Sequence, residues 1–416
     1  MRRSGKFVIA ALVQAALALG AWAGEWAPAR NGGLGHAEGG VQVRVVSADA
    51  ARIELAYRMP APGVSLRADG AALLEVPGLF SEPRAPGAPL LPSLLVNVAL
   101  PLNRSCARLE LAVEEWAALD GRVRVAHHDL LMRPVSEGPQ TCGADPAIYG
   151  RDDPWPAEAL EPGETRYRRG WPFAVGRVNL VRVCPASGRV EYASSFRLIA
   201  TLAPAAGSEL PPRPDEADLA LYDNPGQVGV VAAPATRAAA LAVTPPLAGG
   251  ITAGRGPCDY VIITSTNLNA VSGEYGLERL RQHRVANGLS AAIVTVQEIY
   301  PVYPGRDNAE KVRNFLRDAY VTWGTRYALL AGDTAYVPHR NFYLNGGADT
   351  FPADMYYANL EGDFDANRNS RFGEIFAGDN DVATNKIDLT AELAVGRFSG
   401  ESAYEIQTAV YKTLAY

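Results

Sequence analysis

A short run of acidic and amide side chains near residue 365 has the spacing of a calcium-binding loop. Asp363, Asp365, Asn367 and Asn369 place oxygen atoms at alternate positions, and Glu374 follows eleven residues after Asp363. Hard divalent cations prefer several oxygen ligands, and a terminal Glu can bind through both of its oxygens. The spacing therefore predicts a structural calcium site formed by these five side chains.

Two features of this loop leave an alternative open. Arg368 stands at the sixth position, where Gly normally makes the sharp turn, and no helix is predicted on either side. The alternative is a solvated turn rich in Asn and Asp. Asp379, Asn380 and Asp381 either add ligands to the same site or form another turn.

Thiols and imidazoles are few in the C-terminal part of the chain. Cys258 is the only cysteine after residue 256, and it precedes the first predicted strand of that part. His283 falls within a charged predicted helix, and His339 falls in a polar loop. A thiolate nucleophile needs a nearby imidazole to lower its pKa, and this pattern does not provide that pair. We therefore assign no catalytic and no cofactor-binding residue.

Strands and helices are predicted to alternate from residue 259 onward. Such alternation with tight connections predicts an α/β domain with a mainly parallel sheet covered on both faces. Ligands of these sheets bind beyond the carboxyl ends of the strands, where Asp333 either binds an ion, orients a base or, as we favour, caps a turn. The predicted strands cover 260–264, 291–296, 327–331 and 393–395, and the predicted helices cover 277–285, 308–323 and 404–416.

The first 23 residues have the pattern of a signal peptide. Arg2, Arg3 and Lys6 precede an apolar run from Phe7 to Leu19, and Ala21–Ala23 offers a cleavage site. The run is shorter than the ~20 apolar residues that span a membrane. We expect an exported chain, secreted or at the cell surface, without a transmembrane segment. Export permits disulfides among Cys106, Cys142, Cys184 and Cys258, and their pairing stays open.

Composition divides the rest of the chain into three parts. Residues 24–203 contain alternating runs such as 41–45 and 122–125 and predict a β-rich domain. Residues 204–256 are rich in Ala, Pro and Gly, so we expect a linker or exposed strap without a packed core. Residues 257–416 form the α/β domain. Within the strap, Arg213, Arg237 and Arg255 are the expected sites of trypsin-like cleavage.

The overall composition excludes some classes of protein. The 416 residues carry a net charge of −6, which argues against nucleic acid as a partner. Hydrophobic residues make up 48 % and charged residues 20 %, so large cores are possible and global disorder is excluded.

Several blocks of the C-terminal part, taken together, resemble the opening of a gingipain-type cysteine peptidase domain. Two upstream blocks, 83–92 (PRAPGAPLLP) and 166–185 (RYRRGWPFAVGRVNLVRVCP), are similar to the prodomain of that family. The C-terminal blocks are 308–320 (NAEKVRNFLRDAY), 329–333 (LLAGD), 352–357 (PADMYY) and 394–398 (AVGRF).

The resemblance implies a secreted zymogen that acts on proteins or peptides. Its fold would be a β-rich propeptide, in contact with a three-layer α/β domain of the caspase-like type. In this family the Cys nucleophile and the His base lie in the second half of the catalytic domain. We therefore expect them beyond Tyr416, with the α/β domain of this chain incomplete and inactive by itself.

Two other functions remain open from the sequence. One is a non-catalytic secreted or cell-surface binding protein that reuses the peptidase fold. The other is a carbohydrate-binding or adhesion module on the β-rich part, which should show exposed aromatic residues along one sheet face. The tryptophans of that part, at 26, 116, 155 and 171, are too scattered to show such a face.

Overall fold

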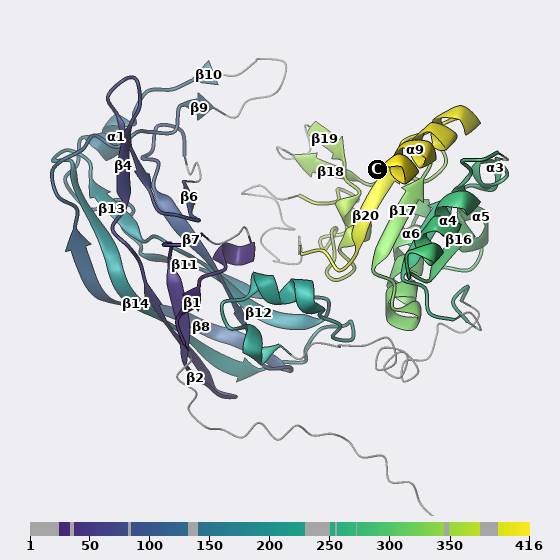
Figure 1. The fold of residues 1–416 in the computed structure, drawn as a ribbon, viewed down its shortest axis with the longest axis horizontal. Coiled ribbons are helices and arrows are strands. Elements are labelled where there is room, and N and C mark those ends of the chain that lie inside the picture. The colour runs from purple at the N-terminus through teal and green to yellow at the C-terminus, as the bar shows by residue number, and fades with distance from the viewer. Residues whose placement is uncertain are drawn as a thin grey trace, which may run out of the picture.

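The computed structural model contains a β-rich region and an α/β region, joined by a strap (Figure 1). The predicted signal peptide, Arg237, Arg255 and residues 379–381 lie outside the described residues. No helix of the described part is long and apolar enough to cross a membrane. The structure describes residues 25–33, 37–81, 85–131, 140–228, 250–253, 256–271, 273–344, 349–374 and 390–416.

Two antiparallel sheets pack against each other in the β-rich region, which confirms the predicted class. The larger sheet has the order β1-β2-β3-β14-β13, with β8 paired to the other side of β14. It consists of β1 (Ala27–Pro28), β2 (Gln42–Ala48), β3 (Arg52–Arg58), β8 (Arg104–Ala118), β13 (Val181–Cys184) and β14 (Arg189–Pro204). The second sheet consists of β11 (Leu160–Arg168), β12 (Trp171–Val178), β7 (Pro92–Ala99) and β6 (Phe80–Ser81).

Alternating apolar residues of the two sheets form the core of this region. Tyr57 of β3 and Phe196 of β14 stack with ring centroids 4.8 Å apart, and both are almost fully buried. Short elements complete the region: η1 (Asn31–Gly33), β4 (Gly63–Leu66), β5 (Ala72–Glu75), β9 (Leu130–Leu131), β10 (Gln140–Thr141) and α1 (Pro146–Tyr149).

One predicted strand of this region is wrong. Residues 122–125 form no strand, and only Val125 makes an isolated bridge, to Ala72. The main chain of this segment bonds to two different parts of the region, since Val123 N–H donates to Gly188 O in the turn after β13 and Arg124 O accepts from Ala72 N–H in β5. A regular strand needs a continuous ladder to one neighbour.

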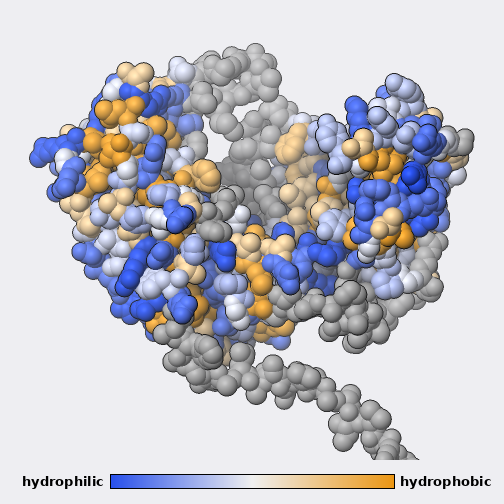
Figure 2. Space-filling model, in the orientation of Figure 1, coloured by the Kyte–Doolittle hydropathy of each residue, from blue (hydrophilic) through white to orange (hydrophobic). Residues whose placement is uncertain are grey.

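The α/β region is built on a four-stranded sheet in which every pairing is parallel, as the sequence predicts. In spatial order the strands are β16 (Ala291–Thr295), β15 (Tyr260–Thr264), β17 (Tyr327–Ala331) and β20 (Ala394–Phe398). One face packs on α4 (Leu277–Ala286) and α9 (Ala403–Ala415), and the other face packs on α6 (Asn308–Asp318). Hydrophilic residues cover most of the viewed face of both regions, and apolar residues form separate patches (Figure 2).

Helix α6 begins and ends close to where the sequence predicts. The Asp307 side chain accepts a hydrogen bond from Glu310 N–H, and the Glu310 carboxylate accepts one from Arg306 N–H. The helix continues as η5 (Ala319–Trp323) and stops at Gly324, which adopts a φ of 69°. The remaining short elements are α3 (Thr266–Asn269), α5 (Val296–Ile299), β18 (Asn341–Leu344), β19 (Asp349–Pro352) and α7 (Met355–Ala358).

Residues 205–228 of the strap contain η3 (Glu216–Leu221) and η4 (Pro225–Gln227) and are packed at both ends. Leu210 is buried in the core of the α/β region, and Tyr222 packs against Phe173 of the β-rich region. The expectation that this stretch lacks a packed core is therefore wrong for these residues. Arg213, an expected cleavage site, donates instead to main-chain carbonyls of Tyr320 and Val321.

Asp223 fixes the end of the strap inside the β-rich region. Its carboxylate accepts hydrogen bonds from Tyr57 Oη at 2.9 Å and from Arg30 N–H at 2.7 Å. The side chain is 5 % exposed. Burial raises the pKa of Asp223 to about 6, although both hydrogen bonds act in the opposite direction.

This raised pKa predicts a pH dependence of stability. A carboxyl group whose pKa is higher in the folded state binds protons more tightly there, so its contribution to stability falls as pH rises between about 4 and 6. We expect the wild-type chain to gain up to about 3 kcal/mol relative to Asp223→Asn when pH falls from 7 to 4. Urea unfolding of both proteins at several pH values measures this difference. A difference that stays constant with pH would contradict the assignment.

Candidate functional site at the carboxyl edge of the parallel sheet

Hydrogen bonds tie together the carboxyl ends of three strands. Thr264 Oγ1 donates to Ala331 O at 2.7 Å, and Gly332 N–H donates to Phe398 O at 2.9 Å. Gly332 has a φ of 147°, and a Cβ atom there would lie 2.9 Å from Tyr336 Cβ. Only glycine suits this position, because other residues rarely adopt that backbone conformation.

Asp333 follows directly at this edge. Its main-chain carbonyl accepts hydrogen bonds from the N–H groups of Tyr336 and Val337, so the residue stabilises the turn through its backbone. The residue is half-buried. Of the three roles considered for Asp333, the turn role is the one that these contacts support.

Arg397, in β20, organises the loop that follows β17. Its guanidinium pairs with both carboxylate oxygens of Asp354, at 2.7 and 2.8 Å. It also donates to the main-chain carbonyls of Gly332, Val337 and Pro338 at 2.7–3.2 Å. The bidentate pair therefore joins the blocks 352–357 and 394–398, which lie far apart in the sequence. The block pattern contained both residues but gave no sign that they form a pair.

Cys258 and the two histidines of the α/β region, His283 and His339, lie on separate segments of the chain. Cys258 is 3 % exposed and lies at the amino end of β15, where its thiol donates to Tyr260 O at 3.3 Å. His339 belongs to the loop beyond the opposite, carboxyl edge, and its Nε2 lies 2.8 Å from Asn341 Oδ1. His283 lies on α4 next to Asn287. Cys106, Cys142 and Cys184 are free thiols in this structure.

The predicted calcium loop folds into a compact turn. The Nδ2 atoms of Asn367 and Asn369 approach Glu374 Oε2 at 3.3 and 2.8 Å, so positions five, seven and twelve converge. Glu374 is 3 % exposed. Arg368 at position six has a φ of 62°, the left-handed conformation that glycine normally supplies. The departure from the sequence pattern therefore does not prevent the turn.

Asp365, at position three, is fully buried and already carries a counter-charge. Its Oδ2 pairs with Arg306 Nη1 at 2.5 Å, and its Oδ1 accepts from Ser370 N–H. Among the described residues, no three His, Cys, Asp or Glu side chains gather closely enough to hold a metal ion. A cation at this loop would therefore need amide oxygens as well as carboxylates.

Partly buried ion pairs connect the strap to both regions. Asp215 pairs with Arg169 of the β-rich region and with Arg326 at the start of β17. Burial opposes ionisation of Asp215, but these two guanidinium groups hold its pKa below the usual value. Arg168 pairs with the buried Asp218 and donates to Ala391 O. The β-rich region and the α/β region are thus in direct contact through charged groups.

Comparison with known proteins finds a family match for the C-terminal part of the chain. Residues 254–416 match the family model described as "Peptidase family C25". Two solved structures are similar at 14 % identity: a complex of Porphyromonas gingivalis RgpB pro- and mature domains, and gingipain K from Porphyromonas gingivalis, studied for zymogenic latency. Their TM-scores are 0.35 and 0.32, and the matches cover 45 % and 39 % of this chain and 97 % and 93 % of theirs. No curated protein sequence matches the chain.

The contacts of Arg397 with Asp354 and with three main-chain carbonyls, called the Arg397 clamp below, lead to a testable prediction. Arg397→Lys keeps the positive charge but loses the planar fork that binds Asp354 and the three carbonyls together. We expect the α/β region to lose about 3 kcal/mol of stability, because a buried acceptor left without a donor costs roughly 1–3 kcal/mol. Chemical unfolding measures the loss. Arg281→Lys, which changes an exposed pair with Glu278, is the control and should cost under about 1 kcal/mol; equal losses would contradict the clamp.

Proposed function

We propose a function from one premise: residues 254–416 belong to the gingipain-type cysteine peptidases of family C25. On that premise the chain is the N-terminal portion of a secreted cysteine endopeptidase zymogen that cleaves proteins or peptides. Residues 24–203 would be its propeptide. The observation that carries the proposal is the family match over the whole α/β region, in which the parallel sheet and its carboxyl edge are formed.

The position of Cys258 bears on which thiol is the nucleophile. Chemistry in an open α/β sheet takes place at the carboxyl ends of the strands. Cys258 lies at the amino end of β15 and is buried, and its thiol donates to a main-chain carbonyl. We therefore place the nucleophilic Cys and its His base among residues that follow Tyr416, and we give Cys258 a role in packing.

The ion pairs of the strap support the role of residues 24–203 as a propeptide. A propeptide has to remain bound to the domain that it controls. Asp215 bridges Arg169 and Arg326, and Arg168 reaches Ala391 O, so the contact is made by charged and polar groups. Contacts of this kind bind two folded parts and still allow them to separate in water.

Peptide turnover with a thiol-directed reagent tests the proposal. We expect the 416-residue chain to cleave none of a fluorogenic peptide library in reductant, because a thiol and a base must lie within hydrogen-bond reach. A longer product of the gene that continues beyond Tyr416 should cleave the library, and iodoacetamide should abolish this activity. Cys258→Ala in the longer product should leave the activity unchanged.

Two results would contradict this assignment. The first is cleavage by the 416-residue chain that disappears in Cys258→Ala, which would make Cys258 the nucleophile. The second is a longer product that folds, shown by a cooperative thermal transition, and yet is neither active nor modified by a peptide-based thiol probe. That result would favour a binding protein that reuses the peptidase fold.

We also propose that the loop Asp363–Glu374 binds calcium as a structural ion. The convergence of Asn367, Asn369 and Glu374, together with the left-handed Arg368, supports this assignment. A rotation of each Asn side-chain amide by about 180° would place its Oδ1 atom, instead of Nδ2, beside the Glu374 carboxylate. Asp363 and Asp365 would complete the ligand set, in competition with Arg306 for Asp365.

Glu374→Gln tests this site with little change of shape. Calcium that binds only the folded state stabilises it by mass action, by about 2.7 kcal/mol at 100 times the dissociation constant. We expect millimolar calcium to raise the melting temperature of the wild-type chain and not that of Glu374→Gln. Glu298→Gln, which alters the cap of α5 away from the loop, is the control and should keep the rise. An equal rise in Glu374→Gln would exclude the site.

A further inference from the structure

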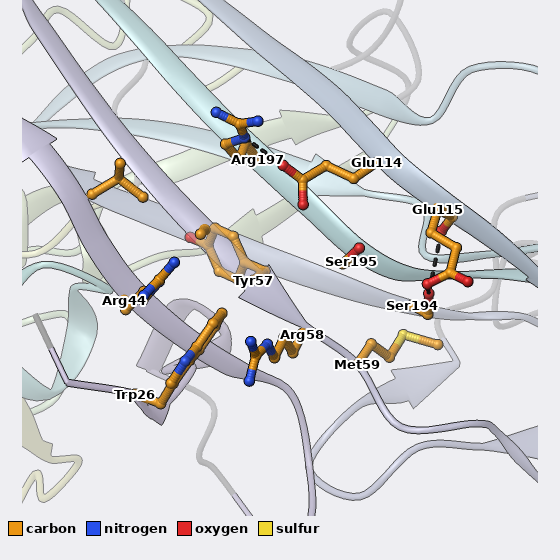
Figure 3. A pocket seen from close by; sticks show the side chains of 12 residues that line it. Trp26, Arg44, Tyr57, Arg58, Met59, Glu114, Glu115, Ser194, Ser195 and Arg197 are labelled. Carbon is orange, nitrogen blue, oxygen red and sulfur yellow. Dashed lines mark hydrogen bonds and ion pairs between the residues drawn. The ribbon is translucent and has the colours of Figure 1, made fainter. Parts of the chain in front are cut away.

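A hollow of about 670 Å³ lies on the outer face of the larger sheet in the β-rich region (Figure 3). The register of the strands explains its position. Ala56 of β3 pairs with Arg44 of β2 on one side and with Arg197 of β14 on the other. Neighbouring strands are about 4.8 Å apart, so a small residue between two long ones leaves a depression about two strand spacings wide. Arg58, two residues along β3, lies on the same face.

Two guanidinium groups on one wall of the hollow have no anionic partner in the described part of the chain. Arg44 and Arg58 contact the ring of Trp26, with distances of 4.9 and 4.2 Å from the guanidinium carbon to the ring centroid. Figure 3 shows Trp26 between the two arginines. The Nε atom of Arg44 is buried and has no hydrogen-bond partner. Stacking on Trp26 fixes both cations without neutralising them.

The other wall has a different charge pattern. Arg197 is neutralised by Glu54 and Glu114, at 3.0 and 2.6 Å. Glu115 accepts a hydrogen bond from Ser194 Oγ at 2.7 Å and forms no ion pair with a described residue. The hollow therefore presents two cations without an ion pair to a described residue on one side and one such carboxylate on the other. An extended peptide with acidic side chains can provide partners for both, through its carboxylates and its main-chain N–H groups.

We propose that this hollow binds an acidic peptide segment, whose carboxylates pair with Arg44 and Arg58 and whose main-chain N–H groups donate to Glu115. Arginine is well suited to this role, because its fork binds carboxylates in a bidentate manner. A sugar ligand is less well matched, since sugars stack on open aromatic faces and both arginines already cover Trp26. The site does not depend on peptidase activity, and it lies in the β-rich region, outside the segment that matches the family model.

Fluorescence anisotropy with the full 416-residue chain tests the proposal. The probe is a fluorescein-labelled peptide of alternating Glu and Gly, and the matched peptide has Gln in place of Glu. We expect the Glu peptide to bind and the Gln peptide to bind at least about tenfold more weakly, since hydrogen bonds to charged groups are worth roughly 1.5–3 kcal/mol. Arg44→Gln combined with Arg58→Gln should weaken binding of the Glu peptide by about tenfold or more.

Two further variants separate a specific site from general attraction and from misfolding. Arg108→Gln with Arg122→Gln removes two exposed charges outside the hollow and should leave the affinity within about twofold. Ala56→Glu places a carboxylate between Arg44 and Arg197 and should abolish binding even if the double arginine variant fails to fold. Equal loss in both double variants, or unchanged binding in Ala56→Glu, would overturn the proposal. Displacement of the peptide by polygalacturonate at a lower carboxylate concentration would overturn the choice of a peptide over an acidic glycan.

Discussion

Buried main-chain carbonyls in loops need hydrogen-bond donors, and in this protein arginine side chains supply them. Arg397 donates to three carbonyls of the loop after β17, and Arg313 donates to the carbonyls of Asn359, Glu361 and Gly362. Arg213 of the strap donates to two carbonyls of η5. A buried carbonyl without a partner is costly, and a guanidinium has five donors at the end of a long side chain. Arg397 and Arg313 therefore fix loops that lack regular secondary structure, and Arg213 fixes the strap to η5.

The same guanidinium groups connect the loops to the aromatic core and to α6. Arg340 lies 3.7 Å from the ring centroid of Phe372 and makes a bidentate pair with Asp307, the residue that caps α6. Burial opposes the charge on Arg340, but Asp307 raises its pKa above the usual value. Arg313 lies over the rings of Tyr356 and Phe364. The loop Asp363–Glu374 is thus held against α6 by charge, hydrogen bonds and aromatic contacts.

The extent to which the sequence predicted this structure depends on the range of the interactions. Local patterns were sufficient for the parallel sheet. The β-branched run 260–264 and the helix end at Gly324 are each determined by residues adjacent in the sequence. Local patterns failed for residues 122–125, whose hydrogen bonds go to two separate parts of the β-rich region, and for the strap, where Leu210 and Tyr222 are buried by regions distant in sequence. The pairs Asp354–Arg397 and Arg169–Asp215 join residues 43 and 46 positions apart. No spacing rule relates such residues, so the site's geometry had to come from the fold.

A comparison of two arginines on α6 tests most directly whether buried guanidinium groups fix these loops. Arg313 and Arg317 lie one helical turn apart, but Arg313 binds three loop carbonyls, whereas Arg317 pairs with the exposed Glu209. Urea unfolding of Arg313→Lys and Arg317→Lys, followed by circular dichroism in the helix band, compares the two variants in one helix. The account predicts a loss of about 3 kcal/mol or more for Arg313→Lys and under about 1 kcal/mol for Arg317→Lys. Equal losses in the two variants would contradict it.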